Sequence, residues 1–325
     1  MPCVLCGQTS LSTISTVDAK SHGALNVAIC GGCGLVQQDP MPSKTELRHF
    51  YAHTYRTDYK KTYTPKAKHI SRAGMAAIER VNFLQSHGVH GGKLLDVGAG
   101  GGEFVYISKT RGYDSKGIEP NIGYSEFARN QYGVEIKTGE LCETRETYDI
   151  ITMFHVLEHM PNFESIRMAW SMLNEGGSLF IEVPNIETND ASPHNIYFKA
   201  HLFYFNRATL SACASKYFDP LVIEARSNLR ILFKRKGRQS HITLPTQDTV
   251  SSLALRLRQK GWFEYLIAGG GMYKLFSKLN QRVRESRLKN KSHLEILNSL
   301  LYLDAEQAST YPSASSDASL RPARG

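Results

Sequence analysis

A single stretch from Leu94 to Phe104, LLDVGAGGGEF, restricts the fold of this chain more than any other feature. Residues typical of a buried strand run into closely spaced glycines, and a helical segment follows. Such a turn leaves backbone N–H groups bare at the N-terminus of a helix, where a ligand can approach them. A GxG turn alone would also suit a nicotinamide or flavin nucleotide. The stretch therefore predicts a cofactor-binding α/β domain and leaves the cofactor open.

The sequence around this stretch alternates strand and helix patterns. Between about residues 91 and 237, short apolar runs alternate with amphipathic stretches. Two late runs, LVIEA and LRILFKRK, predict a hairpin that closes over a Ser-Asn turn. This alternation is typical of a parallel sheet with crossover helices. We therefore expect an α/β fold with a Rossmann-like, doubly wound sheet and a terminal antiparallel hairpin.

Acidic residues near the predicted strand ends favour a cationic cofactor. Asp96 lies two residues before the first glycine, and Glu103 stands where the dinucleotide fingerprint has its third glycine. A carboxylate at Asp96 would repel a pyrophosphate but would attract the ammonium of a methionine moiety. Glu119 ends the second strand, where an acidic side chain can accept hydrogen bonds from both ribose hydroxyls. Glu140 follows the third strand, where a carboxylate can accept a hydrogen bond from an adenine amino group.

In order, the motifs DVGAGGG, GIEP, TGEL, YDIITMFHVLEHMPN and LNEGGSLFIEVPN resemble those of class I S-adenosylmethionine-dependent methyltransferases. The resemblance covers about residues 91–236 and is closest to the branch with ubiquinone-type O-methyltransferases and sugar methyltransferases. It implies S-adenosylmethionine as the cofactor. The cofactor contacts that it implies are Asp96, Gly98 and Gly100 at the methionine end, Glu119 at the ribose, Glu140 and Leu141 at the adenine, and Phe154 on the cofactor face.

Four cysteines near the N-terminus predict a metal site. Cys3-x2-Cys6 and Cys30-x2-Cys33 form two CxxC knuckles that are separated by 23 residues. Two such knuckles can surround a Zn²⁺ ion with a tetrahedron of thiolates. Because cysteine fills all four positions, no ligand position remains open for a reacting water. We therefore expect a structural Zn²⁺ in a zinc-ribbon-like module.

The knuckle pair is followed by an aromatic segment, FYAHTYRTDY. This arrangement resembles deoxysugar C-methyltransferases and related saccharide enzymes. Those enzymes are longer and carry a further C-terminal domain, which a short basic extension replaces here. The resemblance implies a saccharide or a nucleotide-sugar as the acceptor, and it leaves O-, C- and N-methylation open.

Three histidines are candidate bases. Methyl transfer is an in-line displacement, for which an enzyme aligns the acceptor and often removes its proton. His155 and His159 follow the fourth predicted strand, at the edge where such sheets bind ligands, and His201 follows the fifth. The resembling families place a histidine in the loop of His201, and sugar C-methyltransferases place one at His159. His155 is expected to contact cofactor or acceptor, and Glu158 to orient an imidazole. Each could instead be purely structural.

The segment from His155 to His159 also spells HxxEH, a zinc-peptidase signature. Here the signature follows a strand of a cofactor-binding sheet, and nothing else in the sequence resembles a peptidase. We therefore interpret this match as a coincidence.

The basic charge is concentrated late in the chain. The formal net charge is +9, and Lys234 to Asp304 holds 14 Lys and Arg against 5 Asp and Glu, so the remainder is neutral. Basic surfaces attract phosphates or anionic membranes, although a solvated helical face is equally consistent with this charge.

The sequence patterns divide the chain into five segments. The predicted division is a ribbon-like module at 1–40, an aromatic and basic helical connector at 41–90, the cofactor-binding domain at 91–237, a basic helical extension at 238–304 and a disordered tail at 305–325.

The interpretation that unites these features is a methyltransferase acting on a small molecule, with a saccharide or nucleotide-sugar favoured. A ribosomal-RNA-type methyltransferase and a non-catalytic module that binds the cofactor or a partner remain open alternatives. The sequence has no secretory signal and no apolar run near the ~20 residues of a spanning helix, so we expect a cytoplasmic protein. The aromatic and basic extension is consistent with packing, with a homodimer or with peripheral membrane contact.

Overall fold

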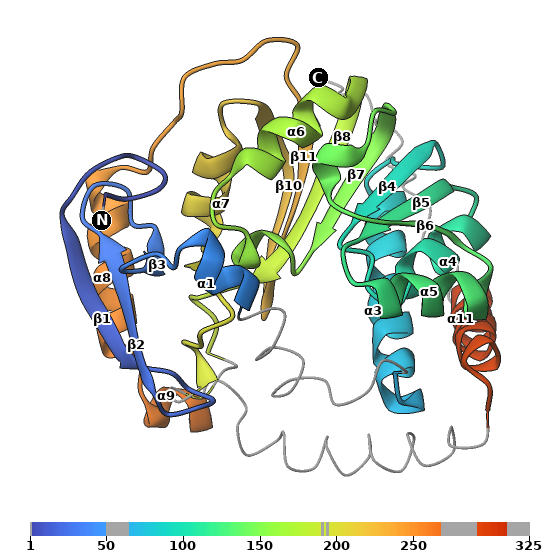
Figure 1. The fold of residues 1–325 in the computed structure, drawn as a ribbon, viewed down its shortest axis with the longest axis horizontal. Coiled ribbons are helices and arrows are strands. Elements are labelled where there is room, and N and C mark those ends of the chain that lie inside the picture. Colours follow the sequence, from blue (N-terminus) through green and yellow to red (C-terminus); the bar gives the residue numbers. More distant parts are fainter. Residues whose placement is uncertain (1, 50–64, 190–191, 193–194, 268–290, 311–325) are drawn as a thin grey trace, which may run out of the picture.

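Figure 1 shows the computed structural model, which describes residues 2–49, 65–189, 192, 195–267 and 291–310. The strands form two sheets. The larger has seven strands in the order β10-β11-β8-β7-β4-β5-β6, and the smaller has four in the order β1-β2-β3-β9. Across the described residues, no helix combines the length and the apolar character needed to span a bilayer.

The seven-stranded sheet has the predicted Rossmann-like topology. Strands β4 to β8 run parallel, while β11 is antiparallel to both β8 and β10. The chain enters at the centre with β4, moves outward to β6, and returns beside β4 with β7. This reversal opens a crevice at the carboxyl ends of β4 and β7, where such sheets bind ligands. The bounds are β4 (Lys93–Val97), β5 (Asp114–Glu119), β6 (Glu135–Thr138), β7 (Tyr148–Phe154), β8 (Leu173–Pro184), β10 (Phe218–Ala225) and β11 (Asn228–Arg235).

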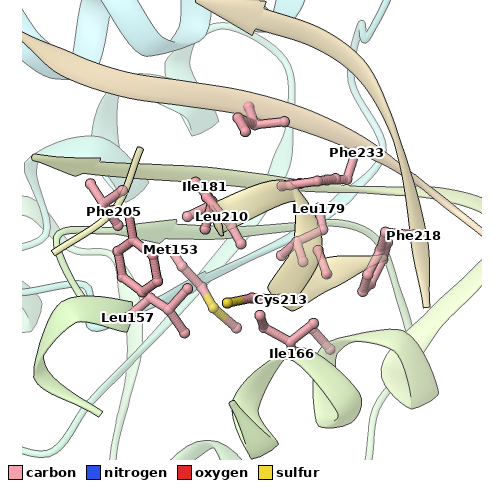
Figure 2. Close-up of a cluster of buried hydrophobic side chains, with 14 of the residues drawn as sticks. Met153, Leu157, Ile166, Leu179, Ile181, Phe205, Leu210, Cys213, Phe218 and Phe233 are labelled. Atoms are coloured by element: carbon pink, nitrogen blue, oxygen red, sulfur yellow. The ribbon is translucent and has the colours of Figure 1, made fainter. Parts of the chain in front are cut away.

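Helices cover both faces of this sheet. Alternate strand residues point to opposite faces, so Leu94 joins the core beneath one layer of helices and Leu95 joins the other. On the second face, Ile166, Leu210 and Cys213 lie together with Leu179 of β8 (Figure 2). The first layer consists of α3 (Ala67–Ser86), α4 (Glu103–Thr110), α5 (Ile122–Tyr132) and α11 (His293–Thr310), and the second of α6 (Glu164–Met172) and α7 (Arg207–Ala214) (Figure 1).

The four-stranded sheet combines distant parts of the chain. Its three N-terminal strands are β1 (Leu11–Val17), β2 (Ala24–Cys30) and β3 (Val36–Gln38), and β9 (Phe203–Tyr204) adds to β3. Helix α8 (Gln247–Gln259) buries Leu253 and Leu257 against it. Burial of each leucine contributes about 1.5–3 kcal/mol. The N-terminal strands are therefore packed with late segments of the chain and do not form a free module. The short helices are α1 (Lys44–His49), α9 (Trp262–Ile267), η2 (Leu141–Glu143) and η3 (Leu157–His159).

Helix α11 corrects one expected boundary. It continues to Thr310, six residues into the segment expected to be disordered from residue 305. Docking on the domain explains its order: Asp304 forms an ion pair with Arg111, and Ile296 and Leu297 are fully buried. Residues 311–325 lie outside the described residues, as do FYAHTYRTDY and the glycine run at 269–271. The other domain limits stay predictions.

Candidate functional site

The glycine turn after β4 is closely packed at one position and open at another. Gly98 has a φ of 72°, and a Cβ added there would lie 2.5 Å from Val156 Cγ2. Gly100 has a φ of 53°, but a Cβ there would meet no atom within 4 Å. Gly98 is therefore required by close packing, whereas the turn at Gly100 is open to a ligand. Helix α4 begins directly after Gly102, so its first N–H groups face the same edge.

Asp96 lies beneath this turn. The residue is 3% exposed, and one of its carboxylate oxygens accepts a hydrogen bond of 2.7 Å from Thr152 Oγ1 on β7. Burial raises the pKa of Asp96 to about 7, while the bond from Thr152 acts to lower it. A cation bound nearby would favour the ionised form and restore an ordinary carboxylate.

Glu119 connects the two turns at the carboxyl ends of β4 and β5. Its Oε2 accepts a hydrogen bond of 2.9 Å from the Gly100 amide, and its Oε1 accepts one of 2.8 Å from the Asn121 amide. Its backbone oxygen accepts a bond from Gly139, which precedes the third acidic position. Glu140 caps the short helix η2 through a reciprocal bond with Glu143. The fold thus brings the predicted acidic residues to neighbouring loops of one edge.

The remaining cofactor contacts predicted from the sequence lie around the same edge. Leu141 is buried at the start of η2. Phe154 ends β7, and its ring packs edge-on against Phe104 and Phe180 at centroid distances of 4.7 and 5.1 Å. The guanidinium of Arg80 lies 4.2 Å from the centre of the same ring. The cofactor role of both residues stays a prediction.

A buried carboxylate that the sequence analysis missed stands next to this ring. Glu182 on β8 is 1% exposed and accepts hydrogen bonds from Arg80 at 2.6 Å and Arg230 at 2.7 Å. Asn228 donates at 3.1 Å, and His155 Nε2 lies 3.2 Å away. Burial acts to raise the pKa of Glu182, but His155 and Arg80 hold it well below its usual range. A glutamate inside the apolar run SLFIEVP is a visible sign of a buried charge. The sequence does not reveal its partners, because they come from α3 and β11, which are distant in the chain.

His155 is held between two buried carboxylates. Its φ of 56° is left-handed, a conformation that costs a non-glycine residue about 1–2 kcal/mol. Its Nδ1 lies 3.3 Å from Glu158 Oε1, and its Nε2 faces Glu182. Burial acts to lower the pKa of His155, but bonds to both carboxylates raise it to about 9. His155 therefore carries a positive charge at neutral pH and is a poor proton acceptor there.

His159 and His201 form a pair on the other side of Glu158. Their ring centroids are 4.9 Å apart, and His159 Nδ1 donates to the Ala200 carbonyl at 2.7 Å. Nδ1 of His159 therefore carries a hydrogen, because a carbonyl oxygen can only accept. Burial lowers the pKa of His201 to about 2, so its ring, which packs at a tilt against Phe198, stays neutral at any working pH.

This arrangement separates the residues of the HxxEH signature. Glu158, His159 and His201 each bring one ligand atom within 4.8 Å of the others, close enough for three ligands of one divalent cation. A peptidase would instead use both histidines of the signature as ligands. His155 pairs with Glu182 and lies outside this cluster, in agreement with our interpretation of the signature as a coincidence.

A cavity of ≈ 260 Å³ lies beside His201, beyond the carboxyl end of β8. Burial lowers the pKa of Lys260 to about 8, and its ammonium donates to the Ile186 carbonyl. The lining is mainly apolar, with Pro184, Ile186, Ile196 and Phe203, and it includes amides, hydroxyls and aromatic rings. Its residues include Asn185, Thr188, Asn195, Phe198, His201, Tyr204, Ser227 and Lys260.

The four N-terminal cysteines gather as the sequence predicts. All four sulfur atoms lie within 4.8 Å of one another, and the Cys3–Cys33 and Cys6–Cys30 pairs are 3.5 Å apart. Tetrahedral Zn²⁺ with bonds of about 2.3 Å places its sulfurs about 3.8 Å apart. In each knuckle, the glycine that follows has a φ near 75° and donates to the carbonyl of the first cysteine. The donor set and its spacing fit Zn²⁺.

Known methyltransferases are similar to this chain over part of its length. Residues 68–217 match a family model described as a methyltransferase domain. The ubiquinone biosynthesis O-methyltransferase of Pseudomonas savastanoi pv. phaseolicola is 32% identical over 117 residues, which is 33% of this chain and 50% of that protein. The chain thus spans about half the length of the curated relatives it matches. Residues 68–217 are therefore similar to a methyltransferase domain, and this match includes the glycine turn after β4.

Two solved structures are similar over part of the chain. Magnesium protoporphyrin IX methyltransferase (ChlM) from Synechocystis PCC 6803 has a TM-score of 0.46 and 14% identity, covering 60% of this chain and 100% of that chain. CalS10, an amino pentose methyltransferase from Micromonospora echinaspora, has a TM-score of 0.41 and 16% identity, covering 57% and 96%. At these scores, neither likeness bears on the acceptor.

The charge of His155 should appear in the pH dependence of stability. Its pKa of about 9 lies above the ordinary value of about 6.5, so its ion pairs stabilise the fold fully below about pH 6.5. This stabilisation is lost as the pH rises through about 9. We expect the difference in unfolding free energy between wild type and His155→Asn to shrink over that interval. Asparagine tolerates the left-handed backbone, and a difference that stays constant with pH would contradict the assignment.

Metal analysis should detect about one zinc ion per purified chain. Cys30→Ser should lower this content strongly and destabilise the N-terminal strands, since metal binding and folding of such sites are coupled. Cys142→Ser is the matched control, because Cys142 is an exposed cysteine outside the cluster. Equal zinc content in both variants, measured by mass spectrometry of the metal, would rule out the four-cysteine site.

Proposed function

We propose that this chain transfers the methyl group of S-adenosylmethionine to a small-molecule acceptor. The observation that carries the proposal is the edge at which Asp96, the open Gly100 turn and Glu119 meet. Carboxylates beside an open glycine turn suit a ligand that combines a cationic amino acid with a nucleoside. The alignment with O-methyltransferases over about half their length supports the same activity.

Each group at this edge has a defined task in the proposed reaction. When bound, the cofactor supplies a methyl group on a sulfonium that an acceptor atom displaces in line. Asp96 holds the methionine ammonium, which favours its ionised form. Glu119 accepts hydrogen bonds from the ribose hydroxyls while it remains oriented by the Gly100 and Asn121 amides. Glu140 and Leu141 bind the adenine, and Phe154 contacts one face of the cofactor.

The cavity beside His201 is the proposed acceptor site. Aromatic rings with amide and hydroxyl side chains beside them suit a ring whose faces are apolar and whose edge carries hydroxyl groups. This lining supports a saccharide or nucleotide-sugar as the acceptor. The relatives' printed name supports a small organic acceptor more generally.

We assign proton removal to the His159–His201 pair. A neutral imidazole is the form that accepts a proton, but a pKa of about 2 gives His201 little driving force on its own. The nearby Glu158 carboxylate would stabilise the imidazolium that forms. His155, already charged, instead contributes a fixed positive charge.

Several sequence-based predictions stay open beside this proposal. They are the structural Zn²⁺, a cytoplasmic location, a homodimer and membrane contact. An RNA acceptor and a non-catalytic role remain the alternatives.

Removal of the Asp96 carboxylate should weaken cofactor binding. Asp96→Ala should weaken S-adenosylmethionine binding in titration calorimetry by at least about tenfold, roughly 1.4 kcal/mol. Glu146→Gln is the control, because Glu146 is an exposed carboxylate before β7, at the opposite end of the sheet. Unchanged affinity in Asp96→Ala would remove this residue from the site, and no binding by the wild type would end the enzyme proposal.

Replacement of the acceptor-side histidine should separate binding from turnover. His201→Ala should keep wild-type affinity for S-adenosylhomocysteine but lose about 10²–10⁴-fold in turnover with a panel of nucleotide-sugars. Methyl transfer is followed with a radiolabelled methyl group. Normal turnover in the variant would reassign the base.

A further inference from the structure

The loop that carries His201 is attached to the N-terminal sheet along its backbone. Strand β9, which follows this loop, pairs with β3 through Val36 opposite Tyr204 and Gln37 opposite Phe203. The Gln38 amide extends the pairing with a bond of 3.0 Å to the Leu202 carbonyl. Segments more than 160 residues apart in sequence therefore form one ladder. Strand β3 lies between the outer N-terminal strands and the larger domain (Figure 1).

The side chain of Gln38 reinforces this attachment. The residue is 4% exposed, and its Nε2 donates to the Lys199 carbonyl at 3.0 Å and to the His201 carbonyl at 2.8 Å. Both N–H bonds of this amide are thus used on the loop. The buried Asp18 at the end of β1 holds the same stretch, because its Oδ2 accepts from the Lys199 amide at 2.8 Å.

The neighbouring glutamine makes the connection to the cysteines. Successive strand residues point to opposite faces, so Gln37 and Gln38 extend in opposite directions from β3. Gln37 is fully buried, and its Oε1 accepts a bond of 3.0 Å from the Val4 amide, which lies between Cys3 and Cys6. Adjacent side chains of one short strand therefore link a metal knuckle to the backbone of His201.

The loop is also bound on its opposite side by the segment after β7. The Leu202 amide donates to the Glu158 carbonyl at 2.7 Å, and His159 donates to the Ala200 carbonyl. The residues assigned to proton transfer are thus connected through a loop whose other edge belongs to the N-terminal sheet. By contrast, the bonds of Asp96 and Gly100 run to Thr152 and Glu119 within the cofactor-binding domain.

We propose that the four-cysteine module is a positioning device for the acceptor side of the active site. Metal at the cysteines orders the first knuckle and β3. Gln38 is then a positioning residue, because its hydrogen bonds fix the backbone of His201. The functional meaning of this coupling rests on the proposed role of His201, but the coupling itself does not. A short sheet with metal-dependent turns is the kind of element whose order follows metal loading. Cofactor binding should be largely independent of it.

Hydrogen exchange of the full chain, read by mass spectrometry, tests the coupling. Removal of zinc with a chelator should raise exchange in residues 196–204 by at least about tenfold, while exchange in β4 stays unchanged. One equivalent of Zn²⁺ should restore the protection. Retained protection of residues 196–204 in metal-free protein would overturn the proposal.

A second variant keeps the test decisive if metal-free protein unfolds. Gln38→Met preserves the side-chain length but removes both donors, and it leaves all four cysteines in place. It should retain zinc and wild-type affinity for S-adenosylhomocysteine, yet raise exchange at residues 199–202. The same substitution at Gln131, exposed on α5, is the matched control and should change none of these quantities. Equal exchange in the Gln38 and Gln131 variants would overturn the positioning role.

The ionisation of His201 supplies a readout that a loss of stability alone would not move. If Gln38 holds the imidazole in its buried place, Gln38→Met should shift the pKa of His201 upward in an NMR titration, toward the ordinary value of about 6.5. An unchanged titration of His201 in a variant that retains zinc would contradict positioning. Neither measurement needs an acceptor, so failure here is distinct from failure of the methyltransferase proposal, which calorimetry decides.

Discussion

A buried negative charge at the end of β8 determines how the site is assembled. Glu182 is removed from water, and its ionised form is stable only because Arg80, Arg230 and His155 converge on it. Loss of one partner from such a group typically costs about 3–5 kcal/mol, since the remaining charge is left uncompensated. The network ties α3 and β11 to the loop after β7. It thereby fixes His155 and, through the chain, the positions of Glu158 and His159.

This charge network separates two environments with different chemistry. On one side, Asp96 and Glu119 present carboxylates beside the open Gly100 turn, which suits a cationic ligand. On the other side, His201 is neutral and borders a mainly apolar cavity that includes amide and hydroxyl groups. A fixed positive charge at His155 lies between them. The acceptor side additionally depends on the N-terminal sheet, whereas the cofactor side is built within the seven-stranded sheet and its helices.

Local sequence accounts well for the cofactor side. Strand β4, its glycine turn and α4 occupy neighbouring positions in the chain, so their residue pattern alone predicts the strand, turn and helix. The two knuckles are predictable for the same reason, because each CxxCG sequence closes its own turn. Sequence analysis did not find the Glu182 network or the addition of β9 to the N-terminal sheet. It also ended the ordered part of α11 too early, because the helix continues to Thr310, past the residues that dock on Arg111 and α3.

By itself, the sequence determined the α/β class, the acidic and glycine-rich edge and the clustering of four thiols, because each follows from short-range spacing. Only the tertiary structure decided which histidine is charged and which is neutral. Those states depend on burial and on partners that are distant in the sequence, such as Glu182 for His155. Only the tertiary structure joined β3 to the loop of His201, because backbone pairing between distant strands leaves almost no trace in side-chain pattern. Both features have the same physical reason, because charge, burial and strand pairing depend on neighbours in space rather than on neighbours in the chain.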